Sequence, residues 1–319
     1  MSPQPWIDGE ALVLGARGML GSDMVETLSR RAHHGPHRRP TAWDLPELDI
    51  TARQDVADAL TSLRPTVVIN AAAFTDVDEC ETQVEQAMSV NAKAPGYIAR
   101  ACAELGAVCV HIGTDFIFDG TATDPYEPDD TPNPLSVYGR SKWEGEQAIR
   151  ESGCEHLIVR TSWLFGPHGA NFVEAILRQA RLGATLRVVS DQVGCPTHAA
   201  DLADAICRLL DVEARGTVHF ANRGQCSRLE FAQAILQNAG LDTGVKPILS
   251  RTLAQPARRP PFSALSTQAY TNATGHRPTH WTDALARYMA AAHPRDEASV
   301  GAKTDPSGVD ELGGRAGEP

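Results

Sequence analysis

A glycine-rich turn near the N-terminus constrains the fold of this chain more than any other feature. Residues 11–15 (ALVLG) form an apolar run typical of a buried strand, which leads directly into residues 15–21 (GARGMLG) and a helical pattern at about 19–31. Such a strand–turn–helix unit is typical of dinucleotide-binding folds, because the N–H groups at the start of the helix face a pyrophosphate. By itself a glycine triplet is a weak signal, and the alternative is a tight strand–helix turn.

Apolar runs alternate with helical patterns along the first half of the chain. Further strands are predicted at residues 66–70 (TVVIN), 107–112 (AVCVHI) and 156–161 (HLIVRT). Helices are predicted at residues 52–64, 82–105 and 136–151. We expect Thr51 and Ser136 to cap the first and last of these helices, and Pro95 to kink or divide the middle one. This alternation predicts an α/β fold with a Rossmann-type, doubly wound parallel sheet.

The second half of the chain has a looser pattern. Helices are predicted at residues 171–182, 199–210 and 227–238, with a strand at 217–221. We therefore expect a dinucleotide-binding domain at 10–165 with returning elements near 190–225, a smaller and mainly substrate-binding lobe at 166–293, and a tail at 294–319. The tail has five glycines and almost no bulky apolar side chain, so we expect it to be disordered.

Charge and cysteine content exclude several classes of protein. A formal net charge of −11 opposes nucleic-acid binding, and we interpret the basic stretch at residues 33–39 as a polar loop. The seven cysteines are an odd number without a C-x-x-C pair, which argues against disulfides and structural zinc and favours the cytoplasm. We find no carboxylate cluster to assign to a metal. No signal peptide is recognisable and no apolar run approaches the ~18 residues of a membrane span, so we expect no membrane partner.

The choice of nicotinamide cofactor rests on two residues. The second strand should end near Asp44, at the ~20-residue spacing where an acidic group meets the ribose hydroxyls of NAD. Arg17 favours NADP instead, because a guanidinium in the turn could pair with the 2′-phosphate of that cofactor. The alternative for Asp44 is a solvated carboxylate at a strand end, and the alternative for Arg17 is a surface side chain without a cofactor contact. We favour NADPH, with NADH accepted. The expected cofactor contacts in this region are Gly15, Arg17, Gly18, Met19, Leu20, Gly21 and Asp44.

Tyr138 and Lys142 form a Y-x-x-x-K pattern at the start of a predicted helix. Four-residue spacing places both side chains on one helical face. The phenol of tyrosine has an ordinary pKa near ~10, and a neighbouring ammonium should lower it by stabilising the phenolate. Tyr138 would then protonate a carbonyl oxygen as a hydride arrives, while Lys142 hydrogen-bonds the nicotinamide ribose. The alternative is a tyrosine and a lysine on a solvated helix face.

Thr114 is the third predicted catalytic residue. It lies at the carboxyl end of the strand predicted at 107–112, and ligands bind beyond such ends at the topological switch point, where we expect the first and fourth strands to be neighbours. Its hydroxyl could donate a hydrogen bond to the substrate carbonyl. The alternative is a hydroxyl that caps its own turn beside Asp115.

Several separated motifs resemble the dTDP-4-dehydrorhamnose reductase family of extended short-chain dehydrogenases. They are residues 70–78 (NAAAFTDVD), 90–92 (VNA), 114–120 (TDFIFDG), 137–142 (VYGRSK), 160–165 (RTSWLF), 191–197 (DQVGCPT), 201–203 (DLA) and 258–260 (RRP). The resemblance spans residues 11–290. It implies reduction of the 4-keto group of dTDP-4-dehydro-β-L-rhamnose by NAD(P)H to give dTDP-L-rhamnose.

The resemblance also implies roles for individual residues. Thr114, Tyr138 and Lys142 would be catalytic. The sugar would be contacted by Thr114, Asp115, Phe116 and Trp163. The cofactor would be flanked by Ala71, Ala72 and Ala73 and contacted by Tyr138 and Lys142. The partner is then a small nucleotide sugar, and a homodimer remains open.

The chain departs from the family pattern at three places. Gly113 stands where serine is frequent, Phe116 where tyrosine is usual, and residues 259–263 (RPPFS) lack an asparagine. The loss of the tyrosine hydroxyl leaves open a reductase for another dTDP-4-keto-6-deoxysugar. Phe116 also occupies the position of the glutamate that dehydratases of this fold use as an acid. The sequence excludes an epimerase less firmly than it excludes a dehydratase. The intact catalytic residues argue against a non-catalytic, nucleotide-binding regulatory subunit.

Overall fold

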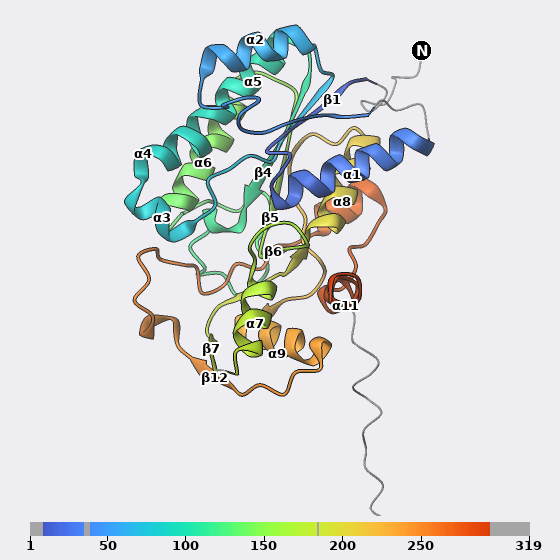
Figure 1. Cartoon of the computed structure of the whole chain (residues 1–319). Coiled ribbons are helices and arrows are strands. Elements are labelled where there is room, and N and C mark those ends of the chain that lie inside the picture. Colours follow the sequence, from blue (N-terminus) through green and yellow to red (C-terminus); the bar gives the residue numbers. More distant parts are fainter. Residues whose placement is uncertain (1–8, 35–38, 184, 294–319) are drawn as a thin grey trace, which may run out of the picture.

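Six strands form the central sheet of the computed structural model, which describes residues 9–34, 39–183 and 185–293. The strands are β1 (Ala11–Leu14), β2 (Thr41–Trp43), β3 (Val67–Asn70), β4 (Val108–Thr114), β5 (His156–Thr161) and β10 (Gly216–His219). They lie in the order β10-β5-β4-β3-β1-β2, and every pairing is parallel (Figure 1). The predicted α/β class with a doubly wound parallel sheet is confirmed. The expectation that the first and fourth strands are neighbours is wrong, because β3 pairs with β1 and separates it from β4.

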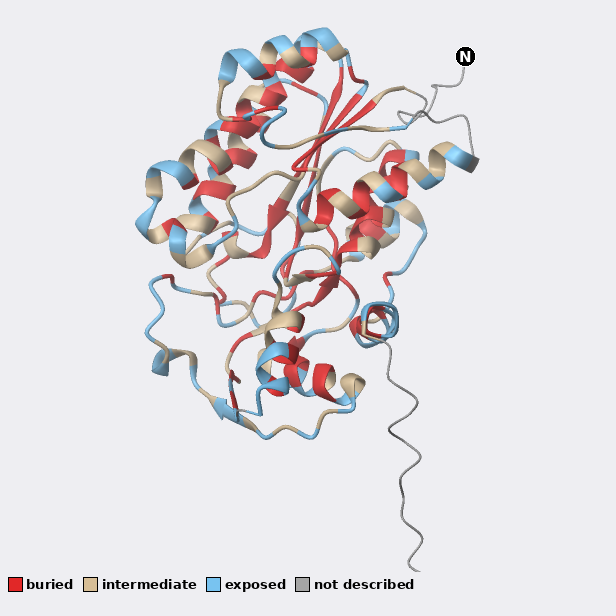
Figure 2. Ribbon diagram, viewed as in Figure 1, coloured by how far each residue is buried: buried red, intermediate tan, exposed pale blue. Residues whose placement is uncertain are grey.

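Helices cover both faces of this sheet. One face is covered by α1 (Met19–His34), α8 (Ala199–Asp211) and α10 (Gln268–Thr274), and the other by α2 (Arg53–Leu63), α5 (Ala94–Leu105) and α6 (Val137–Arg150). Alternate strand residues serve the two faces, since Val13 packs with the first set and Leu12 with the second. Figure 2 shows the buried strands between helices whose inner sides are also buried. The carboxyl ends of β1, β3 and β4 therefore meet at one edge.

Local signals explain most of the helix boundaries. The Ser136 hydroxyl accepts the N–H of Gly139 and caps α6 as predicted. The predicted Thr51 cap of α2 is wrong, because that hydroxyl donates to Asp49 and the methyl group of the cap residue Ala52 cannot form a hydrogen bond. Pro95 lies in the first turn of α5 and follows the π-helical turn η2 (Met88–Lys93), so the long helical region is divided there. Two short helices precede it: α3 (Val77–Thr82) and α4 (Val84–Ala87).

A smaller lobe lies beyond the carboxyl edge of the sheet (Figure 1). Its core is formed by α7 (Phe172–Arg181), α9 (Arg228–Ala239), α11 (Trp281–Ala292), β7 (Leu186–Val189) and β12 (Val245–Ile248). Short elements connect the lobe to the sheet: η3 (Asp115–Ile117), β6 (Leu164–Phe165), β8 (Val193–Gly194), β9 (Thr197–His198), β11 (Cys226–Ser227) and η4 (Ser250–Thr252). Between these lobe elements the chain returns to the sheet through α8 and β10.

Two of the regions discussed above lie wholly or partly outside the residues that the structure describes. The tail at 294–319 lies outside them, as do residues 35–38 of the basic stretch. His33 lies in the last turns of α1, so the interpretation of that stretch as a loop is wrong at its start. None of the helices within the described ranges combines the length and the apolar character needed to cross a bilayer. Within the same ranges, no three side chains of metal-binding type gather at one point.

Candidate active site

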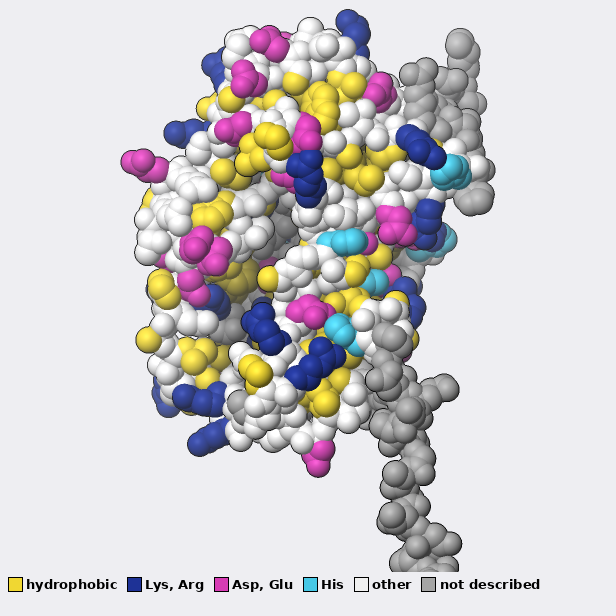
Figure 3. Space-filling view, in the orientation of Figure 1, with side chains coloured by type: hydrophobic (Ala, Val, Ile, Leu, Met, Phe, Trp, Pro, Cys, Tyr) yellow, Lys and Arg dark blue, Asp and Glu magenta, His cyan; other side chains and the backbone are white. Residues whose placement is uncertain are grey.

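A cavity of about 660 Å³ opens at the carboxyl edge of the sheet, between the sheet and the smaller lobe. Figure 3 shows the surface hollowed between these two parts. The structure brings twelve of the predicted site residues to its wall: Gly18, Met19, Leu20, Ala71, Ala72, Ala73, Thr114, Asp115, Phe116, Tyr138, Lys142 and Trp163. A second cavity, of about 330 Å³, shares Gly18 with the first and adds Gly15 and Asp44. Together they form an elongated space across the end of the sheet.

The glycine turn can admit a pyrophosphate. Gly15 has a φ of +72°, and a Cβ there would lie 2.5 Å from the backbone nitrogen of Ala72. A Cβ on Gly21 would lie 1.9 Å from the Gly15 carbonyl oxygen, so this glycine lets α1 pack against the turn. Because α1 begins at Met19 on the cavity wall, the free N–H groups of its first turn are next to that space. The residues present therefore fit a dinucleotide phosphate.

Asp44 and Arg17 interact with each other at the rim. The Asp44 carboxylate accepts the backbone N–H groups of Arg17 and Leu45, each at 2.9 Å. The Arg17 guanidinium donates to the Leu45 carbonyl and pairs with Glu47. The pKa of Glu47 is lowered, first by its own backbone N–H and then by Arg17. Arg17 lies beside Asp44 on a third cavity rather than on the main crevice.

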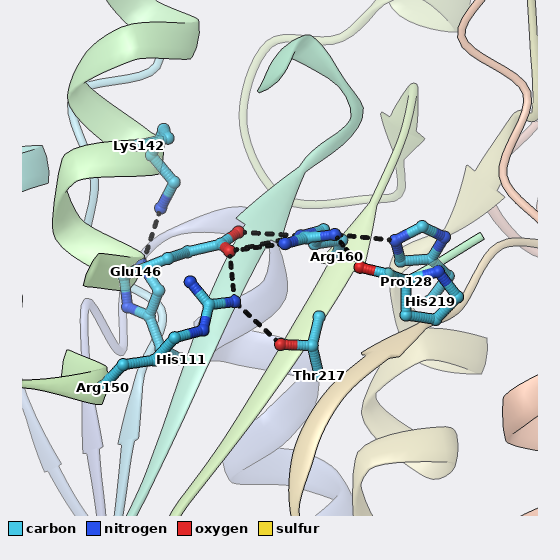
Figure 4. Close-up of polar contacts among 8 residues, drawn as sticks. All are labelled: His111, Pro128, Lys142, Glu146, Arg150, Arg160, Thr217 and His219. Atoms are coloured by element: carbon cyan, nitrogen blue, oxygen red, sulfur yellow. Dashed lines mark hydrogen bonds and ion pairs between the residues drawn. The ribbon is translucent and has the colours of Figure 1, made fainter. Parts of the chain in front are cut away.

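Tyr138 and Lys142 both point to the crevice from α6, as their spacing predicts. Burial raises the pKa of the Tyr138 phenol, and a hydrogen bond with Thr114 opposes that rise. The prediction that the pKa of Tyr138 is lowered is therefore wrong, because the effect of burial is larger. The Lys142 side chain instead extends to β4, where Nζ lies 3.3 Å from Nε2 of His111 (Figure 4). Burial lowers the pKa of Lys142 to about 8, and Glu146 opposes that change.

Thr114 and Asp115 act together at the end of β4. The Thr114 hydroxyl donates to Asp115 Oδ1 at 3.2 Å and accepts the backbone N–H of Phe116, so it caps its own turn. This is the alternative that the sequence left open, yet the same hydroxyl also reaches Tyr138 in the crevice. The Asp115 side chain is 2% exposed and its Oδ2 atom has no hydrogen-bond partner. Burial raises the pKa of Asp115 to about 6, while a hydrogen bond with Ser263 and the charge of Arg228 oppose that rise.

Trp163 is held in an unusual backbone conformation. Its φ is +45°, a left-handed value that costs energy for a bulky residue and is frequent at functional sites. Its indole ring lies under the guanidinium of Arg228, with Cζ 3.5 Å from the ring centroid. Arg228 was not predicted from the sequence. Arg259, which also lines the crevice, pairs with Asp78 at 2.7 Å.

The structure explains one departure from the family pattern, at Gly113, and shows the surroundings of a second, at Phe116. A Cβ on Gly113 would lie 2.6 Å from Cγ of Arg160 and 2.7 Å from Oε1 of Glu146, so serine has no room beside this buried ion pair. Phe116 packs edge-to-face on Tyr138, with 5.6 Å between the ring centroids. It contributes an apolar ring to the crevice and no hydroxyl.

Comparison with known proteins places the chain in a family. The family described as RmlD substrate binding domain matches residues 9–293. The dTDP-4-dehydrorhamnose reductase of Mycobacterium tuberculosis is 39% identical over 297 residues, which cover 91% of this chain and 94% of that protein. The spore coat polysaccharide biosynthesis protein SpsK of Bacillus subtilis is 38% identical over 280 residues, covering 88% and 96%.

Solved structures agree with this assignment. A crystal structure of dTDP-4-dehydrorhamnose reductase from Bacillus anthracis in complex with NADP has a TM-score of 0.85 and 32% identity, covering 89% of this chain and 99% of that one. The chain therefore belongs to the RmlD family, the dTDP-4-dehydrorhamnose reductase family that its motifs resemble.

Proposed function

We propose that this chain reduces the 4-keto group of dTDP-4-dehydro-β-L-rhamnose with NADPH and releases dTDP-L-rhamnose. The observation that carries this proposal is a single crevice that joins the glycine turn, through Gly18, to Tyr138 and Lys142. Relatives that are named for this reaction match the chain over most of its length, which supports the same substrate class here.

The cofactor would lie along the two cavities. The turn from Gly15 to Gly21 would hold the pyrophosphate, and Ala71, Ala72 and Ala73 would flank the dinucleotide. Lys142 would hydrogen-bond the nicotinamide ribose. The bound nicotinamide supplies the hydride for the carbonyl carbon. We propose NADPH as the preferred form, with NADH accepted, because Arg17 at the rim can approach a 2′-phosphate while Asp44 suits free ribose hydroxyls.

Tyr138 is the proposed acid. Because burial raises its pKa, the phenol stays protonated at neutral pH and can donate to the substrate oxygen as negative charge develops there. Thr114 would hold the same oxygen by a hydrogen bond, which stabilises that charge. The ammonium form of Lys142 would then stabilise the phenolate that remains.

The opposite wall of the crevice suits a nucleotide sugar. The Asp115 carboxylate lies beside the Ser263 hydroxyl, and its Oδ2 atom can accept a sugar hydroxyl. Trp163 lines the same crevice with its indole ring stacked against Arg228. Arg228 and Arg259 also line this crevice, and the guanidinium of Arg228, whose charge interacts with the Asp115 carboxylate, can contact the diphosphate.

A spectrophotometric assay tests this function. The purified chain should oxidise NADPH only when a dTDP-4-keto-6-deoxysugar is present, and the product should co-elute with dTDP-L-rhamnose. NADH should support a slower reaction. Binding of cofactor and substrate without any oxidation of the nicotinamide would overturn the proposal in favour of a non-catalytic nucleotide-binding subunit. Interconversion of the sugar without net consumption of cofactor would identify an epimerase.

Phe116 favours one second candidate. A tyrosine at this position would place a hydroxyl near the sugar, and Phe116 removes it. A reductase for a different dTDP-4-keto-6-deoxysugar would use the same cofactor site and the same acid. Comparison of kcat/KM for epimeric keto-sugars separates the two candidates, and a clear preference for a substrate other than the rhamnose precursor would establish the second.

The remaining assignments are also proposals. We assign residues 10–165 to cofactor binding, with returning elements near 190–225, and residues 166–293 mainly to substrate binding. All seven cysteines are unpaired and buried, which supports our proposal of a reducing, cytoplasmic location. A homodimer is compatible with this function and is tested by measuring the mass of the protein in solution.

A further inference from the structure

We propose that His111 is a positioning residue for Lys142: fixed in the tautomer with its proton on Nε2, it favours the neutral amine of Lys142 and directs the N–H bonds of the ammonium form into the crevice. This inference rests on the proposed reductase function, because Lys142 matters only where Tyr138 exchanges a proton. The two histidine contacts that carry it run from β3 through β4 to α6.

The tautomer is fixed by a backbone group that can only donate. The N–H of Ala72 lies 3.2 Å from Oδ1 of Asn70, so the carbonyl oxygen of this amide faces Ala72 and its NH₂ group faces the other way. Asn70 Nδ2 lies 3.3 Å from Nδ1 of His111. Nδ1 must therefore accept, and the single proton of a neutral imidazole is left on Nε2.

A doubly protonated, cationic form of His111 would not have this tautomer, and the surroundings of the side chain disfavour that form. Its side chain is 0% exposed. Burial holds its pKa well below the ordinary value for histidine, and the charges of Lys142 and Arg150 act in the same direction. The imidazole is therefore neutral near neutral pH.

The Nε2–H bond of His111 then faces Nζ of Lys142 at 3.3 Å. An ammonium group has three donors and no lone pair, whereas an amine has a lone pair that accepts a hydrogen bond. His111 therefore stabilises the amine relative to the ammonium. In the ammonium form, the three N–H bonds are directed away from His111 and toward the crevice that Lys142 lines.

This arrangement suits the return of the proton after each reduction. Tyr138 gives its phenol proton to the substrate oxygen and becomes a phenolate. An N–H proton of Lys142 returns to that phenolate, and the amine that remains accepts the hydrogen bond from His111. The amine then takes up a proton from the solution, which is the one proton that each reduction consumes, and the starting state is restored.

Glu146 is the charged group that acts against His111, because it raises the pKa of Lys142. Glu146 faces Lys142 from the next turn of α6, but its carboxylate is bound to Arg160 Nη2 at 2.9 Å and to Arg150 Nη2 at 2.9 Å (Figure 4). One carboxylate with two guanidinium groups leaves a net positive charge beside the lysine. Tyr138 of the same helix and Asp115 at the end of β4 line the same crevice as Lys142.

A second buried histidine provides an internal reference. His219 lies on β10, where Nδ1 is 3.0 Å from the carbonyl oxygen of Tyr126, which can only accept. Its proton is therefore on Nδ1, and Nε2 accepts from Arg160 Nη1 at 3.2 Å. Burial and Arg160 lower the pKa of His219 to about 3. The two neutral histidines should thus have opposite tautomers.

Nitrogen NMR of the full chain labelled with nitrogen-15 histidine tests the tautomer directly. His111 should show a protonated Nε2 and a bare Nδ1, and His219 the reverse. The signals are assigned by their loss in His111→Leu and His219→Leu. A protonated Nδ1 at His111 would overturn the inference. The measurement needs no turnover, so its result is independent of whether the reductase assay succeeds.

The pH profile tests the effect on Lys142. His111→Leu removes the opposing donor, and Asn70→Asp offers Nδ1–H an acceptor so that Nε2 can accept from the ammonium. Both variants should move the alkaline limb of the kcat profile upward by about one pH unit. His219→Leu, the matched control, should leave that limb in place. A purely structural role would lower Tm without moving the limb, and coincident limbs in both folded variants would sink the inference.

Discussion

The guanidinium of Arg228 stacks on the indole ring of Trp163, with 3.5 Å between Cζ and the ring centroid. The two residues come from distant parts of the sequence, since Trp163 follows β5 and Arg228 begins α9. Burial lowers the pKa of Arg228 to about 10, so the group is still charged at neutral pH. The stack therefore fixes a cation against the indole ring at the same crevice.

Replacement of Arg228 by glutamine should mainly impair binding of the nucleotide sugar. Loss of one charge-assisted contact to a diphosphate corresponds to about 1.5–3 kcal/mol, which is roughly a tenfold to hundredfold rise in KM. Binding of NADPH should change little. Arg187→Gln, on the exposed side of β7 in the same lobe, is the control. An unchanged KM in Arg228→Gln would show that the diphosphate lies elsewhere.

Tyr138→Phe should reduce turnover by about 10²–10⁴-fold, because the variant has no proton to give to the substrate oxygen. Affinity for NADPH, measured by the fluorescence of the reduced nicotinamide, should remain close to that of the unaltered protein. Tyr97→Phe, on α5 away from the crevice, is the control. Retained turnover in Tyr138→Phe would remove this residue from its proposed role.

Arg17 and Glu47 should control the preference for NADPH. Arg17→Ala should lower kcat/KM for NADPH by roughly tenfold or more, since it loses a charge-assisted contact to the 2′-phosphate, and should barely affect NADH. Glu47 competes for the same guanidinium. Glu47→Gln should therefore lower KM for NADPH. Equal losses with both cofactors in Arg17→Ala would indicate a general defect of the turn.

The parts of the site that were predictable from the sequence are those with a local cause. The glycine turn is recognisable because a sharp strand–helix junction needs Gly15 and Gly21 at short range. Tyr138 and Lys142 are recognisable because helical geometry places residues four apart on one face. The cap at Ser136 depends only on its own turn.

Other features depend on packing that no spacing reveals. Arg228 comes to the crevice only because the smaller lobe folds back over the sheet. His111 has the appearance of one polar residue inside an apolar strand, and its contacts with Asn70 and Lys142 arise from strand order and helix placement. The prediction that Thr51 caps α2 is wrong because its hydroxyl donates a hydrogen bond to the nearby Asp49.

Gly113→Ser should destabilise the protein even though serine is frequent at this position in the family. The added Cβ would lie 2.6 Å from Cγ of Arg160, which is near the base of that side chain and cannot move freely. Overpacking of this kind costs about 1–3 kcal/mol. Gly244→Ala is the control, because the nearest atom to its Cβ is 3.9 Å away. A similar Tm for both variants would show that the buried side chains of Arg160 and Glu146 can move to admit the serine without destabilising the fold.

Asp115→Asn should stabilise the fold and weaken the enzyme. The folded state raises the pKa of Asp115 from 3.8 to about 6, so between these values the native protein binds more protons than the unfolded chain. Stability from this group is therefore present at low pH and is lost as pH rises through about 6. At pH values above that window, an ionised and buried carboxylate costs the native state about 1–3 kcal/mol.

The asparagine variant removes that cost, because its amide is neutral and still accepts the hydrogen bond from Thr114. Its Tm should exceed that of the unaltered protein at alkaline pH by about 2–4 °C for each kcal/mol, and the difference should vanish near the ordinary pKa of aspartate. KM for the nucleotide sugar should rise, since the free Oδ2 acceptor is lost. Asp242→Asn, at an exposed position, should change neither property. A lower Tm for Asp115→Asn at alkaline pH would mean that the carboxylate is stabilised in its charged form, against the burial that raises its pKa.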